Sequence, residues 1–110
     1  MMKWVMSQAA TGLLRALIGR AGVPRDRILL TEWRSVDWQS LTFVGERHTI
    51  SLRILGPDSD AAVERLTSGL EEADFVVPGQ IVADIAVVGK PELGSDGSIA
   101  LNLEALTVTD

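Results

Sequence analysis

The single histidine of the chain, His48, is the residue whose type and position best fit chemistry at neutral pH. It follows Gly45 in a run of alternating polar and apolar residues, on the same side of the expected strand as Ile50. A partly buried imidazole beside Glu46 or Glu32 fits a general acid or base. The sequence places no nucleophile next to it. A strand-end histidine bonded to the backbone or half exposed is therefore the favoured interpretation, and His48 is only a weak catalytic candidate.

A pocket between helix and sheet is one possible function for this histidine. We expect His48 to lie opposite Leu41 in a hairpin, with Trp38 nearby. The pocket candidates are Trp38, His48 and Glu32, which would supply an aromatic and polar lining. On this alternative the protein is a small-molecule binder or a small enzyme.

A tryptophan flanked by arginines is the second candidate site. If Ile28 and Leu30 face the core, the alternation of a strand points Trp33 to the opposite, open face of the sheet. Aromatic residues and arginine are enriched at protein interfaces. The interaction-surface candidates are Trp33, Arg34, Arg47 and Arg53. We therefore favour a non-enzymatic interaction module that binds itself, as a homodimer, or another protein.

Metal and cofactor chemistry finds little support. There is no cysteine, and one histidine cannot form a histidine-pair metal site. The carboxylates of Asp58, Asp60 and Glu64 are of the kind that bind Mg²⁺ or Ca²⁺, but the two aspartates are better explained by a helix N-terminus. No phosphate-binding loop or hydrolase motif occurs. We predict no metal site and no cofactor.

Charge is distributed unevenly along the chain. The net charge is −5, which argues against coating nucleic acid. Residues 1–55 nevertheless carry eight basic and four acidic side chains, whereas residues 56–110 carry two and eleven. The halves either mix in space or form a basic and an acidic face that pair head to tail. A third alternative is an adaptor that binds an anionic membrane or RNA through the basic half, and the sequence disfavours both partners.

Size and composition indicate one cysteine-free domain over residues 1–110, with 46% hydrophobic residues. No apolar run reaches the length of a membrane span. The lack of cysteine is typical of a reducing compartment, so we expect a cytoplasmic protein.

The first half predicts a helix followed by a long hairpin. Helical spacing predicts a helix over Met2–Arg20, ended by glycine at Gly22 and by Pro24. Strand-like residues follow over Arg27–Leu55. We expect a β-bulge near Gln39–Ser40 and a two-residue turn in residues 43–46, with Gly45 at positive φ.

The second half predicts a helix over Ser59–Ala73, a central strand over Ile81–Val88 and a last strand over Ile99–Val108. The expected fold is α+β, in the order α-β-β-α-β-β, with a four-stranded, mainly antiparallel sheet and two helices on one face. Repeated Val-Pro pairs suggest two helix-plus-hairpin units, about 1–55 and 56–110. The expected sheet core comprises Ile28, Leu30, Val36, Trp38, Ile50, Leu52, Ile54, Ile81, Ile85, Leu101 and Leu103.

Overall fold

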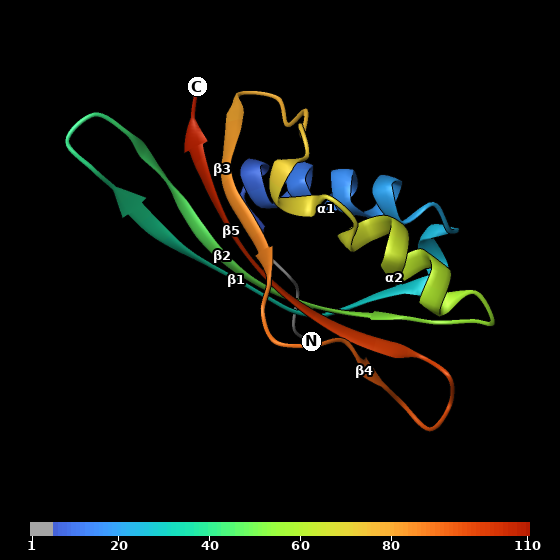
Figure 1. The fold of residues 1–110 in the computed structure, drawn as a ribbon. Helices are drawn as coiled ribbons and strands as arrows, with labels where there is room; N and C mark the ends of the chain where they lie inside the picture. Colours follow the sequence, from blue (N-terminus) through green and yellow to red (C-terminus); the bar gives the residue numbers. More distant parts are fainter. Residues whose placement is uncertain (1–5) are drawn as a thin grey trace.

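The computed structural model describes residues 6–110, which form two α-helices packed on one face of an antiparallel sheet (Figure 1). The elements, with η marking short 3-10 helices, are α1 (Gln8–Ala21), η1 (Arg25–Arg27), β1 (Ile28–Gln39), β2 (Val44–Ile54), α2 (Ser59–Thr67), η2 (Leu70–Glu72), β3 (Gln80–Val87), β4 (Glu92–Leu93) and β5 (Ile99–Thr109). The strand order is β1-β2-β5-β3, and β4 pairs with β5. The expected α+β class and element order are confirmed, apart from the additional short β4. No helix in this described part of the chain is long and apolar enough to cross a bilayer.

Helix α1 begins later than its apolar spacing predicts. Ser7 has extended backbone, and its hydroxyl accepts a hydrogen bond from the amide of Ala10 at 3.1 Å, as an N-cap does. Met6 and Ser7 are therefore outside the helix, and the part of the prediction over residues 1–5 lies outside the described residues. The predicted glycine cap is confirmed, because Gly22 ends the helix with φ of 71°.

Strand β1 contains its bulge at the opposite end from the predicted one. The register shifts between Leu30 and Glu32, so that Thr31 is the extra residue. This early bulge reverses the alternation for the rest of the strand. Trp33 therefore faces the helices, whereas Val36 and Trp38 face away from them, and all three predicted orientations are wrong.

The turn between β1 and β2 also differs from the prediction. The chain reverses over residues 40–43, where the amide of Ser40 donates to the carbonyl of Phe43 at 2.8 Å. Gly45 is already in β2 and has no positive φ. It is buried between strands, and an added Cβ would overlap the carbonyl oxygen of Thr107 and lie 2.8 Å from the Cα of Val108. Close approach of β5, and not turn geometry, accounts for this glycine.

Helix α2 is shorter than predicted because its last turn is interrupted. Ser68 leaves the helical conformation, and Gly69 adopts a left-handed φ of 64° before η2 begins. The predicted buried stripe is confirmed through Ala62, Val63, Leu66 and Leu70.

Strand β3 is an edge strand, and the prediction of a central one is wrong. The central position belongs to β5, which pairs with β2 on one side and with β3 on the other. A register shift between Val82 and Asp84 places Ile81 and Ile85 on opposite faces. Ile81 is consequently 46% exposed, whereas Ile85 is buried. An exposed aspartate and a bulge are common devices on sheet edges.

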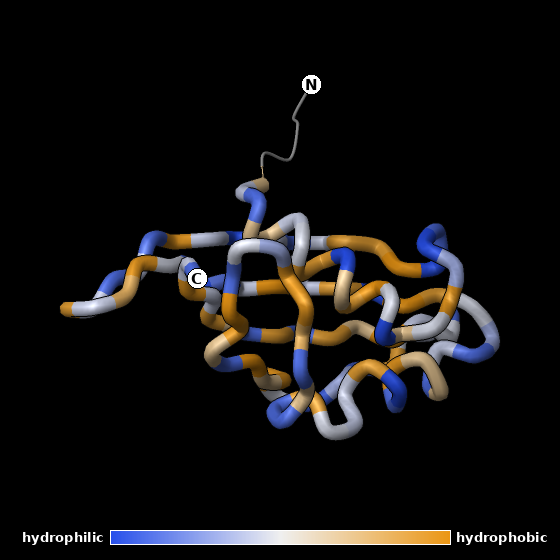
Figure 2. Tube along the Cα trace, turned by 90° about the horizontal axis from the view of Figure 1, so that it is seen from above, coloured by the Kyte–Doolittle hydropathy of each residue, from blue (hydrophilic) through white to orange (hydrophobic). Residues whose placement is uncertain are grey.

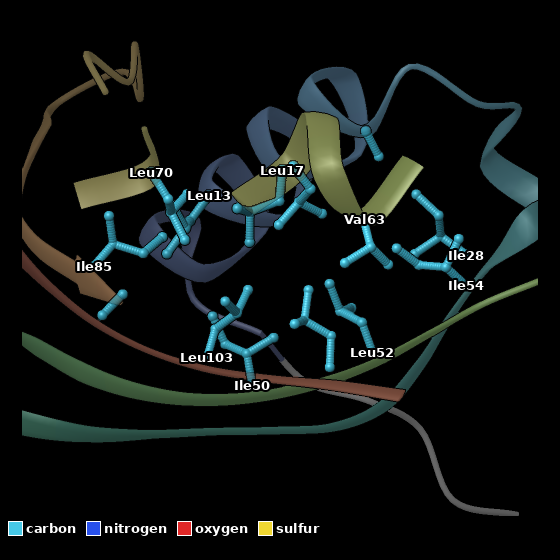
Figure 3. Close-up of a cluster of buried hydrophobic side chains, with 14 of the residues drawn as sticks. Leu13, Leu17, Ile28, Ile50, Leu52, Ile54, Val63, Leu70, Ile85 and Leu103 are labelled. Carbon is cyan, nitrogen blue, oxygen red and sulfur yellow. The ribbon is translucent and has the colours of Figure 1, made fainter. Parts of the chain in front are cut away.

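The core lies between the sheet and the two helices (Figure 3). Seven of the eleven residues expected in it are buried, and they are Ile28, Ile50, Leu52, Ile54, Ile85, Leu101 and Leu103. Leu30 is partly buried against this cluster. Leu13 and Leu17 of α1 lie above the sheet residues and are fully buried.

Candidate functional site

His48 lies in a closed polar cluster beneath the helices, at the hairpin end of the core. The bulge at Thr31 brings Ser35 into register with His48, and Ser35 Oγ lies 2.7 Å from its Nδ1. On the other side, His48 Nε2 lies 2.9 Å from Oγ1 of Thr107 on β5. The indole of Trp33 meets the imidazole edge-on, with 5.6 Å between ring centroids. Three strands thus enclose one imidazole, which is completely buried.

The hydrogen bonds of this cluster favour one tautomer of His48. The indole N–H of Trp33 only donates, and it points at both Ser35 Oγ (3.0 Å) and His48 Nδ1 (3.3 Å). The bond to Nδ1 favours the tautomer in which Nδ1 accepts and the proton of a neutral imidazole lies on Nε2. That N–H donates to Thr107, so every polar atom of the ring has a partner.

Burial also keeps the imidazole neutral. Loss of water around the ring lowers the pKa of His48 below its ordinary value, while the charge of Glu46 acts in the opposite direction. Glu46 accepts a hydrogen bond from the hydroxyl of Ser7 at 2.6 Å. The hydroxyl that caps α1 thus also ties the start of this helix to β2, next to the cluster.

A serine within 2.7 Å of a histidine is the arrangement that activates a nucleophile. Here His48 and Thr107 are completely shielded from solvent, and the indole of Trp33 shares the serine hydroxyl. A substrate has no route to the imidazole in this arrangement. The geometry favours a structural role, in which directional bonds fix the register of three strands.

The three pocket candidates do not come together. His48 faces the helices, whereas the register places Glu32 and Trp38 on the opposite face of the sheet. The expected neighbours of His48 are also wrong, because Ser35 and not Leu41 lies opposite it. The sequence prediction missed Ser35 and Thr107. Thr107 carries a usable signal, since it continues the inward alternation of Leu101 and Leu103.

The open face of the sheet holds three of the four interaction candidates. Arg34 and Arg47 are exposed there, and Arg53 is half-buried. Trp33 is the exception and a correction, because it is only 9% exposed and belongs to the core. Arg53 donates to the hydroxyl of Ser98 at 2.8 Å, so this side chain already has a partner within the chain.

The outer end of the β1–β2 hairpin is apolar and projects beyond the rest of the sheet (Figures 1 and 2). Leu41 is fully exposed, Val44 is 62% exposed and Phe43 is 48% exposed. Turns usually carry polar residues, glycine or proline, so three large apolar side chains at this tip are unusual.

A groove runs between α1 and β1 on the helix side of the molecule. It has a volume of about 350 Å³, and its lining residues are Met6, Leu14, Ile18, Arg25, Ile28 and Leu30. A smaller hollow of about 110 Å³ adjoins it along α1 and adds Arg15 and Thr11 to the lining. Both ionisable residues around the two hollows are arginines.

The strands of the two halves end at opposite edges of the sheet, but the halves meet in the helix layer, where α1 packs on α2. There Arg20 of α1 donates to the carbonyls of Leu66 and Ser68 and lies over the ring of Phe75. The first half supplies α1, η1, β1 and β2, and the second supplies α2, η2 and the β5–β3 side of the sheet. Residues 8–39, here called the basic flank, hold five basic and three acidic side chains. Residues 59–87, the acidic flank, hold one and six. Between the two sheet edges lie β2 and β5, so the flanks end at opposite edges.

Comparison with known proteins gives a likeness of shape only. No family model and no curated protein matches the chain. Two chains of solved structures match it. One comes from the structure described as "Virion of native gene transfer agent (GTA) particle"; it is 17% identical over 87% of this chain and 84% of that chain, with a TM-score of 0.49. At this identity and TM-score, no residue of the protein acquires a role from the similarity.

Proposed function

We propose that the protein is a non-enzymatic self-associating module whose copies pack head to tail, the basic flank of one against the acidic flank of the next. The observation that carries this proposal is the strand order β1-β2-β5-β3 combined with the charge of each flank. Unlike surfaces that meet in this way make a heterologous contact, in which every copy offers one surface of each kind. Opposite charges favour that contact and disfavour like-with-like pairing.

Two further features support association over catalysis. The strands β1 and β3 both have an unpaired side in the described fold, and unpaired strand edges are templates for association. Among residues 6–110, Ser35 and His48 are the pair that resembles a catalytic dyad, and the imidazole of His48 is fully buried. The expected homodimer is the smallest assembly of such a series, although its two copies would contribute different surfaces.

Sedimentation velocity over a range of protein and salt concentrations tests this function. Head-to-tail copies should associate more at higher protein concentration, and the association should weaken from about 0.05 M to about 0.5 M salt as exposed charges are screened. A heterologous contact continues until a ring closes or a filament grows, so native mass spectrometry would show which occurs. A protein that stays monomeric at high concentration and low salt would contradict self-association. A dimer indifferent to salt would contradict the electrostatic contact between flanks.

A further inference from the structure

The groove between α1 and β1 has the lining of a site for an apolar side chain accompanied by carboxylates. Its floor is formed by the apolar residues Met6, Leu14, Ile18, Ile28 and Leu30. Arg25 lines the same groove, and Arg15 lines the hollow beside it. Apolar floors with a few charged groups at the margin are typical of recognition sites. No acidic residue is part of either lining, so the two arginines have no carboxylate beside them there. An occupant that carries carboxylates would therefore bind most favourably.

One segment of the same chain has the matching chemistry. Residues 71–76, here called the acidic segment, hold the exposed carboxylates of Glu71, Glu72 and Asp74. They end at Val76, whose side chain is 88% exposed. A valine this exposed next to three carboxylates is complementary to an apolar groove next to two arginines.

The acidic segment is held in place at both ends. Before it, Leu70 is buried in the core, and η2 packs beside β3. After it, Val77 is only 4% exposed and lies against α1, where an added Cβ on Gly12 would be 2.7 Å from Val77 Cγ1. The exposed Val76 is thus presented from a fixed backbone, which reduces the entropy lost on binding.

Within one copy the acidic segment does not fill the groove, because Val76 is 88% exposed and its neighbours contact α1 elsewhere, with Val77 against Gly12 and Phe75 beneath Arg20. The groove lies along β1 and the acidic segment follows η2 beside β3, at the opposite edge of the sheet. In a head-to-tail arrangement with β3 of one copy next to β1 of another, the segment of the first would face the groove of the second. Both helices lie on the same face of the sheet, so the two surfaces also meet in the same layer (Figure 1).

We propose that the α1–β1 groove of one copy binds the acidic segment of a second copy, with Val76 against the apolar floor and the carboxylates beside Arg15 and Arg25. This inference rests on the proposed head-to-tail self-association and names its two surfaces. Other occupants of the groove, such as a different acidic protein, are outcomes of the test below.

Charge reversal on each surface separately is the decisive experiment. The groove variant is Arg15→Glu with Arg25→Glu, and the segment variant is Glu71→Lys with Asp74→Lys. Each alone should weaken self-association at least tenfold in sedimentation velocity, because like charges then meet. An equimolar mixture should restore association, since the acidic groove of one variant accepts the basic segment of the other. The restored species should alternate the two variants, as native mass spectrometry would show.

Matched variants on other surfaces control for net charge. Arg47→Glu with Lys90→Glu makes the same change at exposed positions outside both flanks, and Glu92→Lys with Glu104→Lys makes the opposite one. These controls should change association less than twofold, and circular dichroism should show that every variant is folded.

The results distinguish a failure of the groove assignment from a failure of the proposed self-association. If the natural chain associates but the groove variant behaves like its control, head-to-tail association stands and the groove assignment is overturned. Val76→Asp, which places a charge against the apolar floor, gives an independent readout and should also weaken association at least tenfold. If the natural chain is monomeric under all conditions, self-association fails, and the groove loses its proposed occupant with it.

Discussion

At one end of the helix-covered face, Ile28, Leu52 and Ile54 are buried by apolar contact alone, as Figure 3 shows. At the other end, His48 and Thr107 are buried just as completely, but through hydrogen bonds. Apolar contacts accept many shapes, whereas hydrogen bonds require particular atoms at particular distances. The apolar end therefore supplies stability with little dependence on pH. The polar end specifies which residues of β1, β2 and β5 lie side by side, and it depends on the protonation of one ring.

The largest loss of stability should come from a substitution at the polar end, where the backbones of β2 and β5 approach closely at Gly45. Gly45→Ala places a methyl group against the carbonyl oxygen of Thr107, so β2 and β5 must separate at this point. We expect a loss of about 4 kcal/mol or more in the free energy of unfolding, measured with urea, which is in the range of backbone strain combined with lost pairing. Gly19→Ala is the matched control. Nothing lies within 4 Å of its added Cβ, and helix propensity should make it neutral or stabilising. Equal stability of the two variants would contradict the close approach.

Truncation at the apolar end should be the next most costly change. Leu52→Ala removes a side chain that is 1% exposed and leaves a cavity, for which we expect a loss of about 3 kcal/mol in urea unfolding. Leu29→Ala, on the open face with 47% of the side chain exposed, should cost well under half as much. The loss of unfolding free energy caused by Leu52→Ala should be the same at pH 7 and pH 5.5. A pH-dependent loss would mean that the two ends are coupled.

Removal of one hydroxyl at the polar end should cost less than the cavity but should be specific. Thr107→Val keeps the shape of the side chain and leaves the Nε2–H of His48 without an acceptor. An unsatisfied buried donor costs about 1–3 kcal/mol, and we expect a value near the middle of that range. Thr109→Val makes the same change two residues later, at an exposed position of β5, and should be close to neutral. If both substitutions are neutral, the Thr107 hydroxyl is not an essential acceptor.

The smallest effect should be the pH dependence of stability, and we expect it to arise at the polar end, from protonation of His48. Burial lowers the pKa of His48 below its ordinary value of 6.5. The unfolded chain therefore binds a proton more readily than the folded one, so the free energy of unfolding falls as pH falls through that value. Urea unfolding of His48→Gln should show a shallower decline between pH 7 and pH 5.5 than the natural chain. An unchanged slope would show that other groups cause it.

Much of the apolar end follows from the sequence, whereas the polar end does not. The regular alternation from His48 to Ile54 and from Ile99 to Leu103 predicts the inward residues of β2 and β5, and both runs are confirmed. The α+β class follows from the same patterns. The bulge at Thr31 could not be located, because a bulge leaves no signature of its own and the apolar residues on both sides of it fit either face.

That one misplaced bulge accounts for most of the errors around the candidate site. Because the bulge was expected at the wrong end of β1, Trp33 was assigned to the wrong face and Ser35 was not recognised as the partner of His48. The charge asymmetry was visible in the sequence, but its effect depended on strand order. A strand order of β1-β2-β5-β3 places β1 and β3 at opposite edges of the sheet, and this order is set by long-range pairing that no local pattern records.

The central position of β5 has a consequence for the order of events during synthesis. Every other helix and strand precedes β5 in the chain, yet β2 and β3 have no contact with each other in the sheet except through it. A ribosome releases the β1–β2 hairpin, both helices and β3 before the strand that joins them. Until then β2 presents an open edge of unpaired backbone groups and an uncovered apolar face, so we expect the nascent chain to depend on chaperones until residues 99–109 emerge.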